Sequence, residues 1–177
     1  MWYNKRNKFE FSGGAMNIRK AKQKDMEKIL EIYAYARDFM KRTGNPTQWG
    51  DIYPKEEMLR DDIEKGNLYV CGENDGIMGV FAFITGIEPT YSYIENGSWK
   101  NDCPYGTIHR IASAGQAKIF DFCIDFCKEK IENVRIDTHF DNKIMQRLIE
   151  RNGFEKCGVI YVEDGSPRIA YQFTGKK

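Results

Sequence analysis

The segment from residue 106 to residue 131 constrains the fold most, because it joins a strand pattern, a tight loop and an amphipathic helix. Residues 106–113 predict a central strand, and the loop Ala114-Gly115-Gln116-Ala117 leads directly into the helix. The apolar residues after this loop recur at the spacing of one helical face, namely Ile119, Phe122, Cys123, Phe126, Cys127 and Ile131. A strand that passes directly into an amphipathic helix is typical of α/β proteins.

Strand and helix patterns alternate along most of the remaining chain. Short apolar or alternating runs predict strands at residues 18–21, 68–71, 77–84, 134–138, 157–162 and 169–173. Helical spacing predicts helices at residues 26–43, 55–65 and 142–152, with Asp25 and Asp141 as N-caps and Gly153 as the stop of the last helix. We therefore expect an α/β fold whose mixed central β-sheet of about six to seven strands is flanked by about four helices.

Length and charge limit the domain organisation and the partners. The chain has 177 residues, a formal net charge of +1 and 41% hydrophobic residues, which is typical of one globular domain. We expect residues 16–177 to form this domain and residues 1–15 to form an N-terminal extension that can stay disordered. The near-neutral charge argues against a nucleic-acid partner, and no apolar run approaches the roughly 20 residues of a membrane helix.

The five cysteines are odd in number and lack the paired spacing of a metal site. Free cysteine behaves as a small hydrophobic residue, so these side chains are expected to be buried, reduced thiols. We accordingly expect a cytoplasmic protein without a metal ion.

The order of the elements, together with three short motifs, resembles the GCN5-related N-acetyltransferase (GNAT) family. The motifs are Ile18-Arg19-Lys20-Ala21 followed by Asp25, Ile108-His109-Arg110-Ile111-Ala112 before the loop, and Asp141-Asn142 opening a helix that ends in Asn152-Gly153-Phe154. The resemblance covers about residues 16–173. It implies transfer of an acetyl group from the co-substrate acetyl-CoA to an amine of a small molecule or a peptide.

The resemblance also implies which residues bind acetyl-CoA. Beside the pantetheine arm would lie Ile111, Ala112 and Ser113, and Asn142 would lie near its thiol end. The pyrophosphate would contact the loop and the start of the next helix, at Gln116, Ala117, Lys118, Ile119 and Phe120, because helix N-termini bind anions through unpaired N–H groups. N–H donors of the central strand would stabilise the oxyanion.

Two positions depart from the family pattern. The family usually has Gly-x-Gly where this chain has Lys118-Ile119-Phe120-Asp121, and a tyrosine acid where this chain has Ile149. An alternative therefore stays open, in which a catalytically impaired GNAT-fold module binds CoA or another small ligand as a sensor or interaction protein. Self-association through the loop at residues 86–104, as in a homodimer, is a further alternative.

Three residues are candidates for proton transfer. His109 and His139 are the only histidines, and imidazole is the side chain that titrates nearest neutral pH. His139 follows a strand at its C-terminal end, where ligands of open α/β sheets bind, and His109 lies within the central strand. Tyr105 is a candidate proton donor. A structural role is the alternative for each of them.

Aromatic residues gather in two loops and predict the walls of the acceptor site. Trp49 and Tyr53 follow the first helix, whereas Tyr91 and Trp99 lie in the long loop at residues 86–104. Tyrosine and tryptophan combine an apolar ring with a polar atom, and long loops in compact domains are often functional. These four residues therefore predict a pocket for a partly apolar amine. Arg168, in the last hairpin, is expected to be a surface charge.

Overall fold

The computed structural model describes residues 10–11, 14–74, 76–115 and 118–175. Its sheet has the strand order β1-β2-β3-β4-β5-β6-β8-β7, in which only β5 and β6 pair in parallel among the described strands. The strands are β1 (Glu10–Phe11), β2 (Gly14–Lys20), β3 (Leu68–Glu73), β4 (Gly79–Thr85), β5 (Gly106–Ser113), β6 (Asn133–Thr138), β7 (Glu155–Tyr161) and β8 (Pro167–Thr174). The expected mixed α/β sheet is confirmed.

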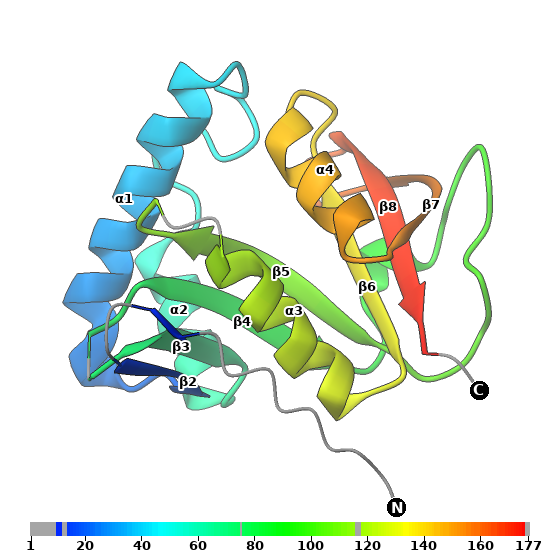
Figure 1. The fold of residues 1–177 in the computed structure, drawn as a ribbon. Helices are drawn as coiled ribbons and strands as arrows, with labels where there is room; N and C mark the ends of the chain where they lie inside the picture. The colour runs from blue at the N-terminus through cyan, green and yellow to red at the C-terminus, as the bar shows by residue number, and fades with distance from the viewer. Residues whose placement is uncertain (1–9, 12–13, 75, 116–117, 176–177) are drawn as a thin grey trace, which may run out of the picture.

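Four α-helices cover the two faces of the sheet, as expected (Figure 1). They are α1 (Met26–Arg42), α2 (Glu56–Glu64), α3 (Lys118–Lys130) and α4 (Lys143–Arg151). Strand alternation explains the division of the core, because successive side chains of a strand point to opposite faces. In β4, Phe81 and Phe83 pack with α3 and α4, whereas Val80 and Ala82 pack with α1 and α2.

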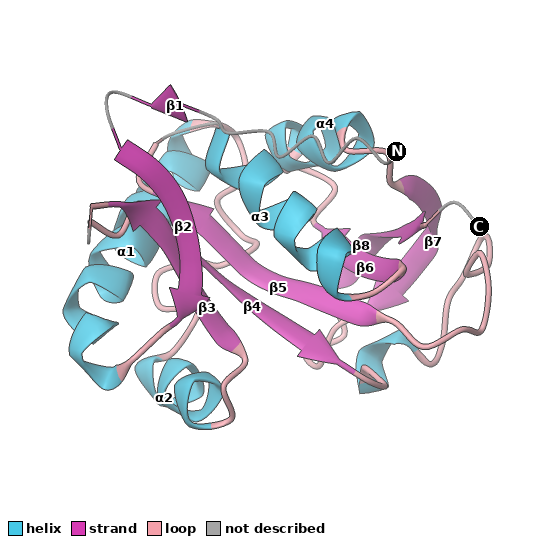
Figure 2. Cartoon of the chain, turned by 60° about the horizontal axis from the view of Figure 1, so that its bottom comes forward, coloured by secondary structure: helices cyan, strands magenta, loops and turns pink. Residues whose placement is uncertain are grey.

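The parallel pair β5–β6 opens along its length, as Figure 1 shows. Its register spans Gly106–Ile108 opposite Val134–Ile136, and beyond these residues the two strands separate. On its other side β5 continues beside β4 to Ser113, with an irregular register between His109 and Ala112. Figure 2 shows β2, β3, β4 and β5 side by side in this half of the sheet.

The irregular register is a β-bulge centred on Arg110, which has φ of +53°. This left-handed conformation is unfavourable for a residue with a side chain, so the surroundings must hold it. The hydroxyl of the buried Tyr33 donates to the Arg110 carbonyl at 2.8 Å. The Arg110 Nη2 donates to the Asp62 Oδ2 at 2.6 Å, within a mostly buried ion pair.

One of the two expected helix caps is wrong. The side-chain cap of α4 is Asn142, whose Oδ1 accepts from the Met145 N–H at 3.1 Å, while Asp141 lies beside His139. Asp25 is the N-cap residue of α1, as expected, but its carboxylate accepts from the Lys22 N–H and pairs with Arg19 instead of capping α1. The error at α4 arises because several adjacent residues can cap a helix, and only the path of the chain selects one.

The long loop at residues 86–104 is packed onto the sheet rather than free. It contains the 3₁₀ turn at Pro89–Tyr91, and Glu95 exchanges backbone hydrogen bonds with Val159 of β7. The Trp99 ring lies under the Arg135 guanidinium, which is 4.0 Å from the ring centroid. Four of the cysteines are buried and free, as expected, whereas Cys103 is exposed. No helix of the described chain is long and apolar enough to cross a membrane.

Candidate functional site

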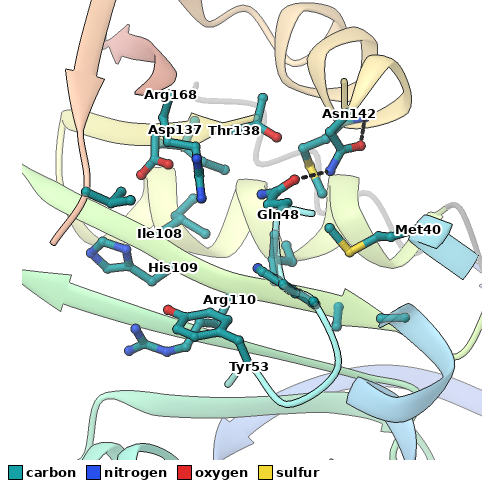
Figure 3. Close-up of a pocket in the computed structure, with 18 of the residues that line it drawn as sticks. Met40, Gln48, Tyr53, Ile108, His109, Arg110, Asp137, Thr138, Asn142 and Arg168 are labelled. Atoms are coloured by element: carbon teal, nitrogen blue, oxygen red, sulfur yellow. Dashed lines mark hydrogen bonds between the residues drawn. The ribbon is translucent and has the colours of Figure 1, made fainter. Parts of the chain in front are cut away.

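A cavity of about 940 Å³ lies where β5 and β6 separate (Figure 3). Its walls come from the end of α1, the loop after it, β5, β6, the start of α4 and the turn between β7 and β8. This volume is in the range of small-molecule sites in proteins. The cavity is therefore the candidate active site.

One wall is the bulged half of β5. Residues 108–113 all line the cavity, and the pairing with β6 ends at Ile108. The backbone of residues 109–113 therefore borders the cavity on the side where a neighbouring strand would otherwise lie. Exposed strand edges of this kind offer alternating N–H and C=O groups to an extended ligand.

A hydrogen bond between two side chains crosses from the first half of the chain to α4. The Asn142 Nδ2 donates to the Gln48 Oε1 at 3.0 Å (Figure 3), and the Asn45 Nδ2 donates to the same oxygen at 2.7 Å. Gln48, Trp49 and Asn142 all line the cavity. The loop after α1 and the start of α4 thus form two joined sides of the site.

A carboxylate–imidazole pair lies at the other end of the cavity. The His109 Nε2 is 3.0 Å from the Glu88 Oε2, and the second carboxylate oxygen accepts from the backbone and hydroxyl of Thr90. The hydrogen bonds from His109 and Thr90 outweigh the effect of burial and lower the pKa of Glu88 to about 2. Glu88 is thus a stable carboxylate that orients the imidazole ring.

Asp137 and Arg168 bring two further charges to this end. The Asp137 Oδ2 accepts from the Tyr91 hydroxyl at 2.8 Å, and burial raises the pKa of Asp137, against the opposing effects of His109, Tyr91 and Arg168. Arg168 is buried in the wall rather than on the surface, which corrects the expectation for this residue.

The predicted site residues divide into two groups. The cavity is lined by His109, Ile111, Ala112, Ser113, Asn142, Trp49 and Tyr53. Those that do not line it are His139, Tyr105, Tyr91 and Trp99. His139 accepts from the Asp141 N–H, Tyr105 accepts from the Glu88 N–H, and Tyr91 packs against Trp99. Tyr91 and Tyr105 therefore hydrogen-bond to Asp137 and Glu88, respectively, from outside the cavity.

The predicted pyrophosphate contacts are only partly described. Gln116, Ala117 and the Lys118 side chain lie outside the described residues. The side chains of Ile119 and Phe120 are buried in the core cluster between α3 and the sheet. Only their backbone groups remain for a ligand.

Several lining residues escaped the sequence-based selection: Gln48, Glu88, Asp137, Thr138 and Arg168. Glu88 follows the predicted strand at 77–84 by four residues and precedes Pro89, which gives it the look of an ordinary turn residue. Asp137 lies near the end of a predicted strand, two positions before His139, and this placement could have marked it as a candidate site residue. In the described part of the chain, no three His, Cys, Asp or Glu residues gather as a metal site would require.

Comparison with solved structures identifies related proteins. A GNAT-family acetyltransferase from Streptococcus agalactiae is 31% identical, with a TM-score of 0.82, and the match covers 95% of this chain and 99% of that one. A GNAT-family acetyltransferase from Listeria monocytogenes is 20% identical, with a TM-score of 0.69 and coverage of 95% and 99%. A candidate acetyltransferase from Salmonella typhimurium, solved with its cofactor acetyl-CoA, is 18% identical, with a TM-score of 0.57 and coverage of 92% and 95%.

The last two likenesses concern the fold alone, whereas the first also concerns the sequence. No family model matches the chain, and no curated protein sequence matches it. The 31% sequence identity extends over nearly the full length of both chains. The separated β5–β6 pair and the bulged β5 accompany it in this structure. This chain therefore belongs to the GNAT family of acetyltransferases.

Proposed function

We propose that the protein is an N-acetyltransferase that moves the acetyl group of acetyl-CoA to the amine of a small molecule. The observation that carries the proposal is the cavity between β5 and β6, with an unpaired strand edge on one side and Asn142 on the other. The amide groups of a pantetheine arm can pair with such an edge as a further strand would. Ile111, Ala112 and Ser113 are the residues that would hold it.

The departures from the family pattern affect binding less than the sequence alone suggests. Ile119 and Phe120 point into the core, so their side chains do not occupy the space outside the start of α3. The backbone N–H groups of the first turn of α3 can still meet a pyrophosphate. This favours a working enzyme over the impaired alternative.

The reacting groups can be assigned from the cavity. Acetyl-CoA supplies an activated acetyl group: the amine nitrogen bonds to the thioester carbon, the carbon–sulfur bond breaks, and the thiolate leaves. His109 accepts the proton that the amine loses, and Glu88 is a positioning residue that fixes the ring. Backbone N–H groups at the bulge stabilise the oxyanion.

The thiolate needs a different partner from the family's tyrosine. Ile149 occupies the tyrosine's position and is fully buried between α4 and the sheet. Asn142 lines the cavity, and its Nδ2 can donate a hydrogen bond to the sulfur. In this mechanism the proton itself comes from solvent.

The first test compares the two histidines. Calorimetry with acetyl-CoA should show saturable binding for the wild type, His109→Asn and His139→Asn, because neither ring is assigned to the cofactor. In an assay of thiol release with an amine panel, His109→Asn should lower kcat by about 100-fold, in the usual range for loss of a general base. His139→Asn should keep most of the activity, since its ring lies outside the cavity.

Three results would contradict the proposal or a part of it. Absence of heat and of a thermal shift with acetyl-CoA would remove the cofactor assignment. Binding of acetyl-CoA without thiol release on any amine would instead support a sensor. Equal losses of kcat in both histidine variants would leave the cofactor assignment intact but would remove His109 from its role.

A further inference from the structure

The end of the cavity that holds Glu88, His109 and Asp137 is called the acceptor end. Arg168 is a buried cation at this end, and no carboxylate of the described residues forms an ion pair with it. Arg168 is 7% exposed and lines the cavity, and Figure 3 shows it beside Asp137. Its Nη1 donates to the Ser166 Oγ at 2.9 Å and to the Pro167 carbonyl at 3.0 Å. Among the described residues no ion pair involves this guanidinium, and its Nε and Nη2 groups donate to no acceptor.

A buried charge without a partner is unfavourable, so such groups are normally paired. Asp137 compensates part of the charge through space, but its Oδ2 already accepts from the Tyr91 hydroxyl. The free N–H groups of Arg168 form a planar donor set, and the guanidinium geometry matches a carboxylate.

A second unpaired donor lines the same cavity. Thr138 is 1% exposed and lines the cavity, and its Oγ1 has no hydrogen-bond partner in the described chain. Thr138 of β6 pairs with Ile169 of β8, which directly follows Arg168, so strand alternation places the Thr138 and Arg168 side chains on opposite faces of the sheet. Buried hydroxyl groups are rarely left without a partner, and a ligand would supply one here.

The other charged groups near Arg168 are negative. Glu88 and Asp137 are carboxylates at the same end of the cavity, and Glu163 and Asp164 lie at the turn between β7 and β8. The acceptor end thus combines acidic groups, which attract an amine, with one buried donor set that suits an anion. A molecule with both charges satisfies both sides, whereas a simple cation would leave Arg168 unpaired.

We propose that the acceptor is a small amino acid with a free carboxylate, which Arg168 binds while its amine faces His109 and Glu88. This inference rests on the proposed function and specifies its substrate class. In the transfer, the amine nitrogen gains the acetyl group and loses one proton, and the CoA thiolate leaves. The carboxylate takes no part in bond formation and only orients the molecule.

The test uses matched pairs of amines with acetyl-CoA and the intact protein. The panel contains the twenty protein amino acids, β-alanine and γ-aminobutyrate, each beside its own carboxamide, together with amines that carry no carboxylate. Thiol release gives kcat/KM, and thermal shifts in the presence of CoA give binding where no turnover occurs. For the best acceptor, replacing the carboxylate by the carboxamide should lower kcat/KM by about 100-fold, because buried donors then lose their charged partner.

Variants assign the preference to specific side chains. Arg168→Gln should lose about 100-fold on the amino acid but little on its carboxamide. Ser166→Ala removes a contact of Arg168 but keeps the guanidinium, so it controls for damage to the turn. Arg147→Gln, at an exposed arginine of α4, controls for the change of net charge and should leave both rates unchanged.

Each outcome decides the inference. The inference is overturned if carboxamides or carboxylate-free amines reach the same kcat/KM as amino acids. It is also overturned if Arg168→Gln lowers kcat/KM by the same factor for both members of a pair. Failure of every amino acid to be acetylated or to raise the melting temperature would overturn it as well. Failure of the proposed function has a different signature, namely absence of acetyl-CoA binding. Normal acetyl-CoA binding by Arg168→Gln would show that the cofactor side is intact.

Discussion

At the scale of single residues, the site depends on pairs of groups that fix each other's charge. Glu88 and His109 are one such pair, because the carboxylate keeps the ring nitrogen Nε2 occupied and the ring lowers the pKa of the carboxylate. The same geometry makes Glu88 a contributor to folding stability. A pH experiment can therefore detect the pair independently of activity.

The pH dependence of this contribution has a definite sign. The folded-state pKa of Glu88 is about 2, below its ordinary value of 4.5. Its stabilising effect is therefore complete above about pH 4.5 and is lost as the pH falls toward 2. Between pH 6 and pH 3, the wild type should lose about 2 kcal/mol more of its free energy of unfolding than Glu88→Gln loses.

Urea denaturation at several pH values measures this difference. A double-mutant cycle supplies the control: in the background of His109→Asn, the effect of Glu88→Gln should depend much less on pH, since the partner is gone. A pH-independent difference between wild type and Glu88→Gln would mean that the two groups do not interact in solution.

The sequence pointed to Trp49 and Tyr53 as aromatic residues of a loop and to His109 as one of two histidines, whereas Asn142 came from the family resemblance. Sequence reasoning passed over Glu88 and Arg168, because their roles come from burial beside residues distant in the chain. Glu88 meets His109 across 21 positions, and Arg168 was expected on the surface because it follows a turn. Charged residues near turns are usually exposed, so no pattern within the turn itself distinguishes the exceptions.

At the scale of elements, local periodicity was sufficient to find the strands and helices that carry the site. The bounds of β5 agree with the expected strand at residues 106–113, and α3 follows the expected loop. The bulge in β5 lay beyond sequence reasoning, since it arises from the register with β4 and from Tyr33 on α1. The same limitation explains the wrong cap of α4.

The cap of α4 gives a prediction for stability. Asn142→Ala removes the acceptor for the Met145 N–H, so the protein should lose about 1 kcal/mol of stability. Asp141→Ala at the neighbouring position should have a much smaller effect, because its side chain caps nothing. Thermal or urea unfolding of both variants measures the difference.

Asn142→Asp separates the two functions of this residue. Aspartate can still accept from the Met145 N–H, so stability should be largely retained, whereas the donor to Gln48 is lost. Equal destabilisation by Asp141→Ala and Asn142→Ala would contradict the assignment of the cap.

At the scale of the whole molecule, the sheet consists of two halves that meet at β5 and β6. One half contains β2 to β5 with α1 and α2, and the other contains β6, β8, β7 and α4 (Figure 1). The parallel register of β5 and β6 joins the halves through three residue pairs. Helix α3 packs in the core cluster that both strands share. Where the strands have separated, Gln48 contacts Asn142 across the gap between them. A ligand held in the gap touches both halves and should restrain their relative motion.

Hydrogen exchange tests this coupling. Saturating acetyl-CoA should slow amide exchange at residues 109–113 and 142–148 by about 10-fold or more, because a ligand bound to the folded state suppresses local opening. Gln48→Ala should speed exchange at residues 142–148 in the free protein, and acetyl-CoA should remove most of that difference. Slowing that is equal throughout the chain would mean that the ligand stabilises the fold globally without joining the halves. Unchanged exchange at residues 109–113 would place the ligand away from the β5 edge, and the mechanism built on the separated strands would then fail.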